Sequence, residues 1–222
     1  MMAALIFDLD GVIVDSNAIH VRAWERYLAM HGRPLPPRAD SLIFGRHNDE
    51  IVRAFFGDDI RPEEVRAHGA DKEALYREMM RPVLAQRLVP GVREFLARWR
   101  RLPLALASNA ERANVEFVLE QAGLQQWFRV ILDGRQVRAP KPDPAIYREA
   151  ARRLGVESGS CVVFEDSPAG VAAAQAAGAQ VVGLLTAYKE LPGVTLAVRD
   201  FRDPELEAWL RARLGCCGTL RG

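Results

Sequence analysis

Two aspartates separated by one residue follow a short apolar run near the start of the chain. The run covers residues 5–7, and Asp8 and Asp10 come next with Leu9 between them. In an extended chain this spacing places both carboxylates on the same side. Like charges so close repel each other, and burying them is costly unless a cation or hydrogen-bond donors compensate. The pair therefore indicates a cation-binding site or two solvated loop acids, and both interpretations stay open from the pair alone.

The stretch Asp8–Gly11 is also similar to the start of a calcium-binding loop. An EF-hand loop needs glycine at its sixth position and glutamate at its twelfth. Counted from Asp8, those positions hold Ile13 and Ile19. The sequence therefore excludes an EF-hand.

Two later segments carry groups that suit a phosphate. Ser108 and Asn109 end an apolar run just ahead of a helical pattern, where a hydroxyl can meet a phosphate oxygen. Lys141 stands between Pro140 and Pro142, which restrict the backbone and can hold the ammonium at a fixed point. The alternatives are ordinary, because serine and asparagine before a helix are usually N-caps and a single lysine is usually solvated.

A second pair of carboxylates, Glu165 and Asp166, directly follows the apolar run 161–164. Asp166 can also be a helix N-cap, a role that is compatible with metal binding. Together with Asp8 and Asp10, this pair brings up to four negative charges to one place. Hard oxygen ligands of this kind suit Mg²⁺. The sequence therefore predicts a magnesium site formed by these four acidic residues.

The same residues can perform phosphoryl chemistry. Mg²⁺ and Lys141 offset most of the negative charge, and the site then gains affinity for a phosphate group. A carboxylate can attack phosphorus and form an aspartyl-phosphate, the role expected for Asp8. Asp10 can protonate the leaving oxygen and later activate water. With Ser108 binding the phosphate, these four residues form the predicted catalytic set.

Short apolar runs alternate with helical patterns from residue 89 onward. Buried strands are predicted at residues 104–107, 130–132, 161–164 and 181–185, and helices between them. This alternation indicates a parallel sheet covered on both faces, with ligands beyond the carboxyl ends of its strands. Because Asp8, Ser108 and Glu165 each follow or end a strand-like run, we expect them at one rim of the sheet.

Residues 15–88 break the alternation and carry mainly helical patterns. Val21, Trp24 and Leu28 fall on one helical face, and prolines and a glycine separate the segments. Helices inserted after the first strand predict a cap above the rim. We therefore predict an α/β protein with two domains. These are a Rossmann-like core of residues 1–14 and 89–222 and an α-helical cap domain of residues 15–88.

Four motifs stand in a fixed order along the chain: Asp-Leu-Asp-Gly-Val at residues 8–12, Ser108-Asn109, Lys141 in Lys-Pro-Asp-Pro, and Glu165-Asp166. In this order they resemble the four motifs of the haloacid dehalogenase-like hydrolases. Within that superfamily the chain most resembles the beta-phosphoglucomutase-like phosphatases, over essentially its whole length. Because dehalogenases lack the second acid of the first motif, dehalogenase chemistry is disfavoured.

The resemblance implies a role for each motif. Asp8 is implied as the nucleophile and Asp10 as the general acid and base. Mg²⁺ is implied to be held by Asp8, the Asp10 backbone carbonyl and Asp166, with Glu165 nearby or ligating. The serine and the lysine of the middle motifs are implied to hold the phosphoryl oxygens.

The cap resembles the family less closely. His20 matches a histidine that beta-phosphoglucomutases place just after the first motif, although it can equally be an ordinary helix residue. Lys72, near the start of a helical stretch, resembles a cap lysine of those mutases. The mutases have an arginine three residues after a loop glycine, whereas here Arg46 follows Gly45 directly, as in related sugar-phosphate phosphatases. The predicted substrate-binding residues are His20, Gly45, Arg46, Lys72, Ser108 and Asn109.

Composition excludes several other classes of protein. Among 222 residues, 30 Lys and Arg balance 29 Asp and Glu, so no global field favours nucleic acid or an anionic membrane. The N-terminal apolar run is too short for a signal peptide or a membrane span. Cys161, Cys216 and Cys217 are odd in number and contain no Cys-x-x-Cys spacing, which disfavours a disulfide framework or a zinc site. We expect a cytoplasmic monomer that binds neither nucleic acid nor membrane.

These observations predict a Mg²⁺-dependent phosphatase that hydrolyses a small phosphate monoester, with a sugar phosphate as the expected substrate. The alternative is a beta-phosphoglucomutase, which returns the phosphate to a sugar and needs a bisphosphate activator. A non-catalytic binding protein on the same fold is a remote alternative, because every expected catalytic position is occupied.

Overall fold

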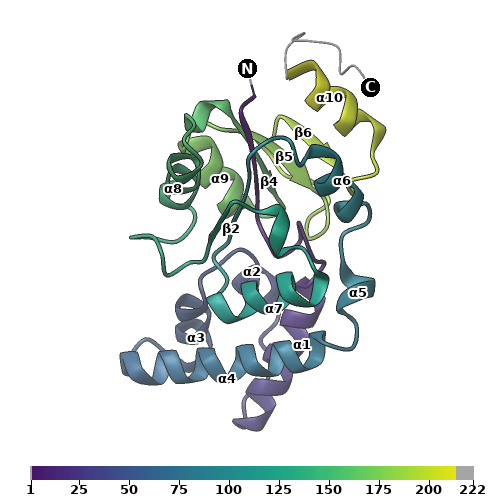
Figure 1. The fold of residues 1–222 in the computed structure, drawn as a ribbon. Helices are drawn as coiled ribbons and strands as arrows, with labels where there is room; N and C mark the ends of the chain where they lie inside the picture. Colours follow the sequence, from purple (N-terminus) through teal and green to yellow (C-terminus); the bar gives the residue numbers. More distant parts are fainter. Residues whose placement is uncertain (1, 214–222) are drawn as a thin grey trace.

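A parallel sheet of six strands forms the centre of the core. The computed structural model describes residues 2–213, and the strand order is β3-β2-β1-β4-β5-β6 (Figure 1). The strands are β1 (Ala4–Phe7), β2 (Leu104–Ala107), β3 (Val130–Leu132), β4 (Cys161–Glu165), β5 (Gln180–Leu184) and β6 (Leu196–Val198). In this order the chain leaves β1 toward β2 and returns to β4, so the direction of winding reverses between β1 and β4. Ligands of open α/β sheets bind beyond the strand ends at such a point.

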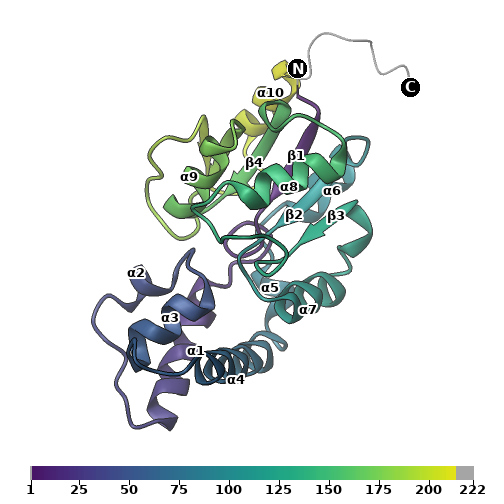
Figure 2. The same cartoon turned by 90° about the vertical axis from the view of Figure 1, so that its left-hand side faces the viewer.

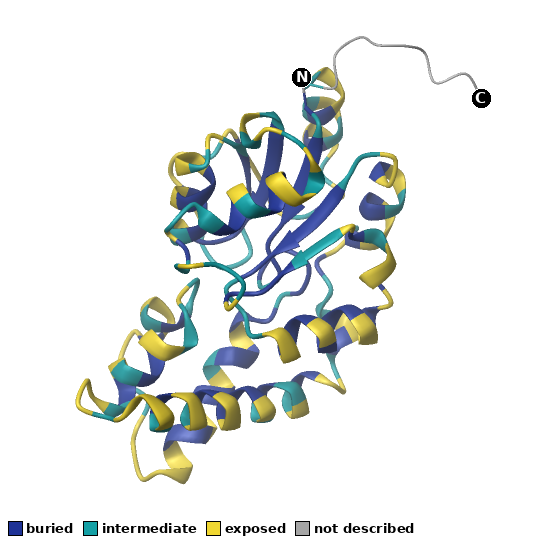
Figure 3. Ribbon diagram, turned by 60° about the vertical axis from the view of Figure 1, so that its left-hand side comes forward, coloured by how far each residue is buried: buried dark blue, intermediate teal, exposed yellow. Residues whose placement is uncertain are grey.

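Helices cover both faces of the sheet, as the buried strands require (Figure 3). Phe7 packs with α6, α7 and α10 on one face, and Ile6 packs with α8 and α9 on the other. The helices of the core are α6 (Val92–Trp99), α7 (Arg112–Ala122), α8 (Ala145–Leu154), α9 (Pro168–Ala176) and α10 (Pro204–Arg213), with short 3₁₀ helices at Gln125–Trp127 and Ser158–Ser160. The predicted Rossmann-like parallel sheet is confirmed. β6 and α10 were not predicted.

Five helices lie between β1 and the rest of the core. They are α1 (Asn17–Met30), α2 (Ala39–Ile43), α3 (Asn48–Phe56), α4 (Pro62–Met80) and α5 (Leu84–Arg87). The first four pack around a hydrophobic cluster of their own, which includes Trp24, Leu28 and Phe55. Figures 1 and 2 show this group beyond the carboxyl end of β1.

Two chain segments connect this group of helices to the core, and they run side by side. Val14 forms an antiparallel bridge with Leu88, and the backbone N–H of Asp15 donates to Arg87 O at 2.7 Å. We propose that the boundary between the two domains lies in these two connecting segments, at residues 15 and 88 as the sequence predicts.

One expectation for the cap helices needs correction. Val21, Trp24 and Leu28 share a face as predicted, because the half-buried Val21 packs against the cluster that contains the other two. α4 begins at Pro62, so Lys72 lies in the middle of a helix and not near its start. Along its buried face α4 carries Val65 and Gly69 and then Lys72 and Glu73, so the apolar period begins only at the end of the helix, with Tyr76 and Met80. Of the described residues, 2–213, no helix is both long enough and apolar enough to cross a membrane.

Candidate active site

Three carboxylates meet at the carboxyl ends of the central strands. Asp8 directly follows β1, Glu165 ends β4, and Asp166 follows it. One oxygen from each of the three lies within 4.8 Å of the others, and all three side chains are buried. The adjacent strands are held in register by the backbone N–H of Asp8, which donates to Phe164 O at 3.0 Å. The structure thus brings together three of the four predicted metal residues.

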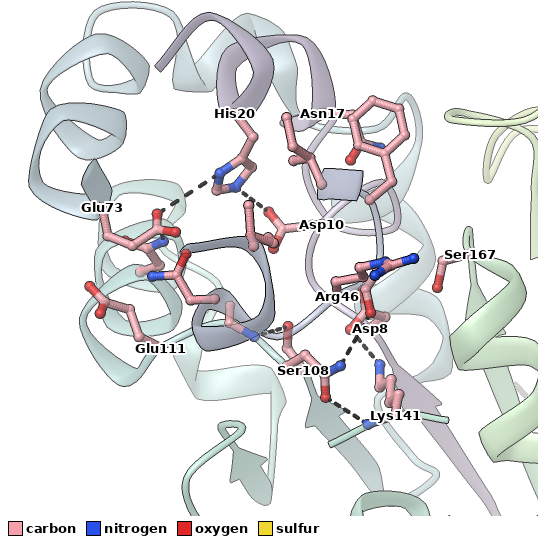
Figure 4. Close-up of a pocket in the computed structure, with 18 of the residues that line it drawn as sticks. Asp8, Asp10, Asn17, His20, Arg46, Glu73, Ser108, Glu111, Lys141 and Ser167 are labelled. Atoms are coloured by element: carbon pink, nitrogen blue, oxygen red, sulfur yellow. Dashed lines mark hydrogen bonds and ion pairs between the residues drawn. The ribbon is translucent and has the colours of Figure 1, made fainter. Parts of the chain in front are cut away.

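Lys141 lies between two of these carboxylates (Figure 4). Its Nζ is 2.7 Å from Asp8 Oδ1 and 2.7 Å from Glu165 Oε1. Burial opposes the charge of the Lys141 ammonium, but these two carboxylates outweigh that effect and raise its pKa. The backbone N–H of Lys141 donates to Asn109 Oδ1 at 3.1 Å, which ties the lysine loop to the end of β2. Lys141 is therefore a fixed cation beside the expected nucleophile.

Glu165 is engaged on both of its oxygens. Oε1 accepts from Lys141 and from Tyr147 Oη. Oε2 accepts from the backbone N–H groups of Asp166 and Ser167 at 3.0 and 3.2 Å, and from the Ser167 hydroxyl at 3.1 Å. These contacts shape the loop that presents Asp166. Glu165 is thus better placed to position the loop than to offer a free oxygen.

The carboxylate of Asp10 is turned away from this cluster and toward the cap. Ser16 Oγ donates to Asp10 Oδ1 at 2.5 Å, and His20 Nε2 lies 3.4 Å from the same oxygen. The next residue, Gly11, has φ +73°, and an added Cβ would lie 1.8 Å from Asp166 Oδ2. Glycine is therefore required at this turn. The side chain of Asp10 does not join the acidic cluster, so only its backbone carbonyl is compatible with the predicted metal role.

The electrostatics of the cluster suit a bound cation. Burial, with a further contribution from Glu165, outweighs the attraction of Lys141 and raises the pKa of Asp8 to about 7. Burial and the neighbouring Glu165 and Asp8 also raise the pKa of Asp166 well above its usual value. A divalent cation favours the ionised carboxylates and removes this repulsion. Because the donors are all oxygens, the site fits a hard cation.

The predicted phosphate-binding residues lie at the end of β2. Ser108 is buried, and its Oγ accepts from the Ala110 N–H at 3.1 Å. The following helix begins only at Arg112, with Glu111 as its N-cap, so Ser108 is not a helix cap. Similarly, Ser167 and not Asp166 caps α9. Both of the ordinary N-cap alternatives for these residues are therefore wrong.

Gly45 and Asn109 join the cap to the core. Asn109 Nδ2 donates to Gly45 O at 3.3 Å. Gly45 has φ +73°, and an added Cβ would lie 2.8 Å from Ser167 Cβ. The cap loop therefore approaches the carboxylate loop closely only because residue 45 has no side chain. Since the amide of Asn109 is engaged at both ends by protein, its contact with substrate stays a prediction.

A buried network of polar side chains extends from Asp10 into the cap. Lys72 Nζ lies 2.9 Å from His20 Nδ1 and 2.6 Å from Glu73 Oε1. Because an ammonium can only donate, His20 Nδ1 accepts, and the ring proton lies on Nε2, facing Asp10. The network continues to the core through Asn114 of α7, whose Nδ2 donates to Glu73 Oε2 at 2.7 Å. Burial opposes the charge of Asp10, but His20, Ser16 and Lys72 together outweigh that effect and lower its pKa.

A pocket of about 70 Å³ lies between cap and core, and every predicted site residue except Glu165 lines it. Sequence reasoning missed further polar residues of the site: Ser16, Asn17, Asn48, Glu73, Glu111, Asn114 and Ser167. Asn17 Nδ2 donates to Asp166 Oδ2 at 3.0 Å, so the cap also contacts the carboxylate loop. Ser16 and Asn17 stand between the first motif and His20, and Glu73 adjoins Lys72. Their proximity along the chain to predicted site residues is therefore the signal that could have identified these three.

Comparison with known proteins identifies the family. The family model of haloacid dehalogenase-like hydrolases matches residues 2–178. The fructose-1-phosphate phosphatase YqaB of Escherichia coli is 32% identical over 186 residues, which cover 81% of this chain and 95% of that protein. The beta-phosphoglucomutase of Bacillus subtilis is 28% identical over 215 residues, which cover 93% of each. The chain belongs to the haloacid dehalogenase-like hydrolases, as its four motifs predict.

Structural comparison gives the same fold. The beta-phosphoglucomutase of Clostridium difficile superposes with a TM-score of 0.83 at 23% identity, over 96% of this chain and 98% of that one. A longer relative, the bifunctional riboflavin kinase/FMN phosphatase of Arabidopsis thaliana, is 28% identical over 215 residues, and the chain spans 56% of its length. The chain is thus an enzyme of a family with phosphatase and phosphomutase members, and the alternative of a non-catalytic binding protein is not supported.

The cysteine predictions are tested only in part. Cys161 is buried and free, and burial raises the pKa of its thiol to about 11. Cys216 and Cys217 lie outside the described residues.

The two cap cations, Lys72 and Arg46, are expected to differ in their effect on stability. Lys72 is 1% exposed and paired with buried Glu73, whereas Arg46 is exposed. Lys72→Ala is expected to lower the free energy of unfolding by about 3–5 kcal/mol, because it leaves a carboxylate buried without its cation. Arg46→Ala is expected to change it by no more than about 0.5 kcal/mol. Urea unfolding of both variants measures this, and equal stabilities would contradict the buried pair.

Proposed function

We propose that this enzyme is a Mg²⁺-dependent phosphatase that hydrolyses a small phosphate monoester, a sugar phosphate, through an aspartyl-phosphate on Asp8. The observation that carries the proposal is the position of Asp8 at the floor of the pocket. There its Oδ1 accepts from Lys141, and Oδ2 accepts no hydrogen bond from the described residues. Asp8 therefore has an oxygen available for attack beside a fixed positive charge.

Asp8 and Asp10 divide the proposed reaction between them. Asp8 attacks phosphorus while Asp10 donates a proton to the leaving oxygen, so the ester bond breaks and the alcohol departs. Asp10 then accepts a proton from water, whose oxygen attacks phosphorus and frees Asp8. Ser16 and His20 hold Asp10 Oδ1, which leaves Oδ2 to carry the proton. A bound phosphate dianion brings negative charge near Asp10 and so raises the proton affinity of Asp10 for the first step.

The remaining residues hold the phosphoryl group and the cation. Ser108 and Lys141 are proposed to bind the phosphoryl oxygens. Asp8, the Asp10 carbonyl and Asp166 are proposed to hold Mg²⁺, with Glu165 positioning their loop. When bound, Mg²⁺ supplies positive charge that stabilises the phosphoryl oxygens in the transition state.

A beta-phosphoglucomutase is the second candidate. His20 and Lys72 favour it, because both match cap residues of the mutases and line the pocket next to Asp10. Arg46 directly after Gly45 favours the phosphatase. The two activities differ in product, since a phosphatase releases free phosphate and a mutase an isomerised sugar phosphate. A monomeric state, a cytoplasmic location and a lack of nucleic-acid binding stay predictions.

Phosphate release from a panel of phosphorylated metabolites tests the proposal. With Mg²⁺ present, we expect free phosphate from a subset of sugar monophosphates at kcat/KM in the range of about 10⁴ M⁻¹s⁻¹ or above. Chromatography of the sugar products, with and without a bisphosphate activator, separates hydrolysis from isomerisation. Isomerised product without phosphate release would favour the mutase, and no turnover of any ester would contradict both candidates.

A further inference from the structure

Tyr147 is a buried residue beside the reaction centre that the proposed mechanism does not use. It lies on α8, six positions after Lys141, and is 1% exposed. α8 packs against β1, β2 and β3, which places the side chain close to the carboxyl ends of the strands (Figure 2). Tyr147 does not line the pocket. Any effect of Tyr147 on the reaction must therefore pass through the residues that it contacts.

The Tyr147 side chain contacts both members of one buried ion pair. Its hydroxyl donates to Glu165 Oε1, the same oxygen that accepts from Lys141 Nζ at 2.7 Å. The Lys141 Nζ also lies 4.8 Å from the centroid of the Tyr147 ring, a distance at which an aromatic ring attracts a cation. Because all three side chains are buried, each of these contacts is stronger than it would be in water.

The carboxylate of Glu165 is fixed from its other side as well. Its Oε2 accepts from the backbone N–H groups of Asp166 and Ser167 and from the Ser167 hydroxyl. Gly170 in the first turn of α9 leaves room for the carboxylate, since an added Cβ would lie 1.8 Å from Glu165 Oε1. Oε1 is therefore the oxygen that Lys141 and Tyr147 share.

The ammonium of Lys141 is divided between two carboxylates. Its Nζ lies 2.7 Å from Asp8 Oδ1 and 2.7 Å from Glu165 Oε1. In the proposed reaction Lys141 must face Asp8 and the phosphoryl oxygens, so Glu165 competes for it. A hydroxyl that donates to Glu165 offsets part of the negative charge of this competitor. Without that hydroxyl, Lys141 would be left as the donor to Oε1 and would be drawn toward Glu165.

We propose that Tyr147 is a positioning residue, whose hydroxyl satisfies Glu165 so that Lys141 stays directed at Asp8 and the phosphoryl group. This inference rests on the proposed function, because Lys141 meets a phosphoryl group only in that reaction. The aromatic ring has a part of its own, since it packs against the ammonium and limits its movement away from Asp8.

Two variants separate the hydroxyl from the ring. Tyr147→Phe removes only the hydroxyl and is expected to lower kcat/KM for phosphate release about tenfold, because a hydrogen bond to a charged group is lost. Tyr147→Leu removes the ring as well and is expected to lower it further. Thermal melts verify that both variants fold, and Tyr147→Phe keeps nearly the whole volume of the side chain.

Tyr27→Phe is the matched control. Tyr27 is a buried tyrosine of the cap whose hydroxyl contacts His68 Nδ1 at 2.9 Å, and it lies outside the pocket. We expect this variant to retain wild-type kcat/KM. Wild-type kcat/KM in Tyr147→Phe would overturn the inference and leave the proposed function intact.

Two affinities distinguish positioning of Lys141 from a general loosening of the site. Calorimetry with orthovanadate, a mimic of the phosphoryl group, is expected to show about tenfold weaker binding to Tyr147→Phe in the presence of Mg²⁺. Mg²⁺ alone is expected to bind at least as tightly as to the wild type, because the hydrogen bond of Tyr147 goes to Glu165 and not to the proposed metal ligands. Weaker binding of both would indicate a structural role and overturn the inference.

The binding measurement also separates the two proposals. If the wild type releases no phosphate from any ester but binds orthovanadate, the proposed function fails, and the affinities of the wild type and Tyr147→Phe still decide the inference. A protein that neither releases phosphate nor binds orthovanadate would overturn both.

Discussion

Asp8→Asn is expected to reduce phosphate release to background, a loss of roughly 10⁴-fold or more in kcat. The amide keeps the shape of the side chain but lacks the charge and most of the nucleophilicity of the carboxylate. The variant is expected to stay folded, because burial already raises the pKa of Asp8 and a neutral group there avoids the cost of a buried charge. Steady-state kinetics and a thermal melt together measure both effects.

Asp59→Asn is the matched control, because Asp59 is an exposed acid of the cap outside the pocket. It is expected to retain wild-type turnover. Rapid quenching of the wild type followed by intact-mass measurement is expected to detect a phosphorylated protein that is absent from Asp8→Asn. Near-wild-type turnover by Asp8→Asn would exclude the aspartyl-phosphate mechanism.

Removal of divalent metal is the second change with a large expected effect. EDTA is expected to abolish phosphate release, and Mg²⁺ to restore it, whereas Zn²⁺ restores it poorly because the donors are all oxygens. Asp166→Ala is expected to raise the Mg²⁺ concentration for half-maximal activity by about tenfold or more, since it removes one of the three clustered carboxylates. A titration of Mg²⁺ against activity measures this for the wild type and the variant.

Direct binding separates a loss of metal affinity from a loss of folding. Calorimetric titration of Mg²⁺ into the wild type is expected to give saturable binding that Asp166→Ala weakens and Asp59→Ala does not. The melting temperature of Asp166→Ala is not expected to fall, because burial and repulsion raise the pKa of that carboxyl in the free protein. Full activity in the presence of chelator would remove metal from the mechanism.

The strand ends and the family motifs could be predicted from the sequence because they depend on local order along the chain. Apolar runs of three to five residues mark buried parallel strands, and the residue after each run must lie at the carboxyl edge of the sheet. Asp8, Ser108 and Glu165 were placed in this way. β6 was not predicted, and its middle residue is exposed.

Only the tertiary structure decided which groups each polar side chain contacts. Lys72 and Arg46 are both cationic cap residues, but Lys72 becomes a buried partner of Glu73 and His20 because α4 packs beside α1. The carboxylate of Asp10 turns to the cap and not to the cluster of three carboxylates, because Ser16 and His20 offer it donors.

The lining of the pocket between cap and core was equally invisible in the sequence. It joins Asn48 and Glu73 of the cap to Glu111, the N-cap of α7, and to Asn114 within α7, which are far apart along the chain. Spacing along a strand or helix determines which face a residue occupies, but the partner on that face comes from another element. The sequence by itself therefore predicted the candidate catalytic residues, and the packing of cap on core decided which side chains line the pocket beside them.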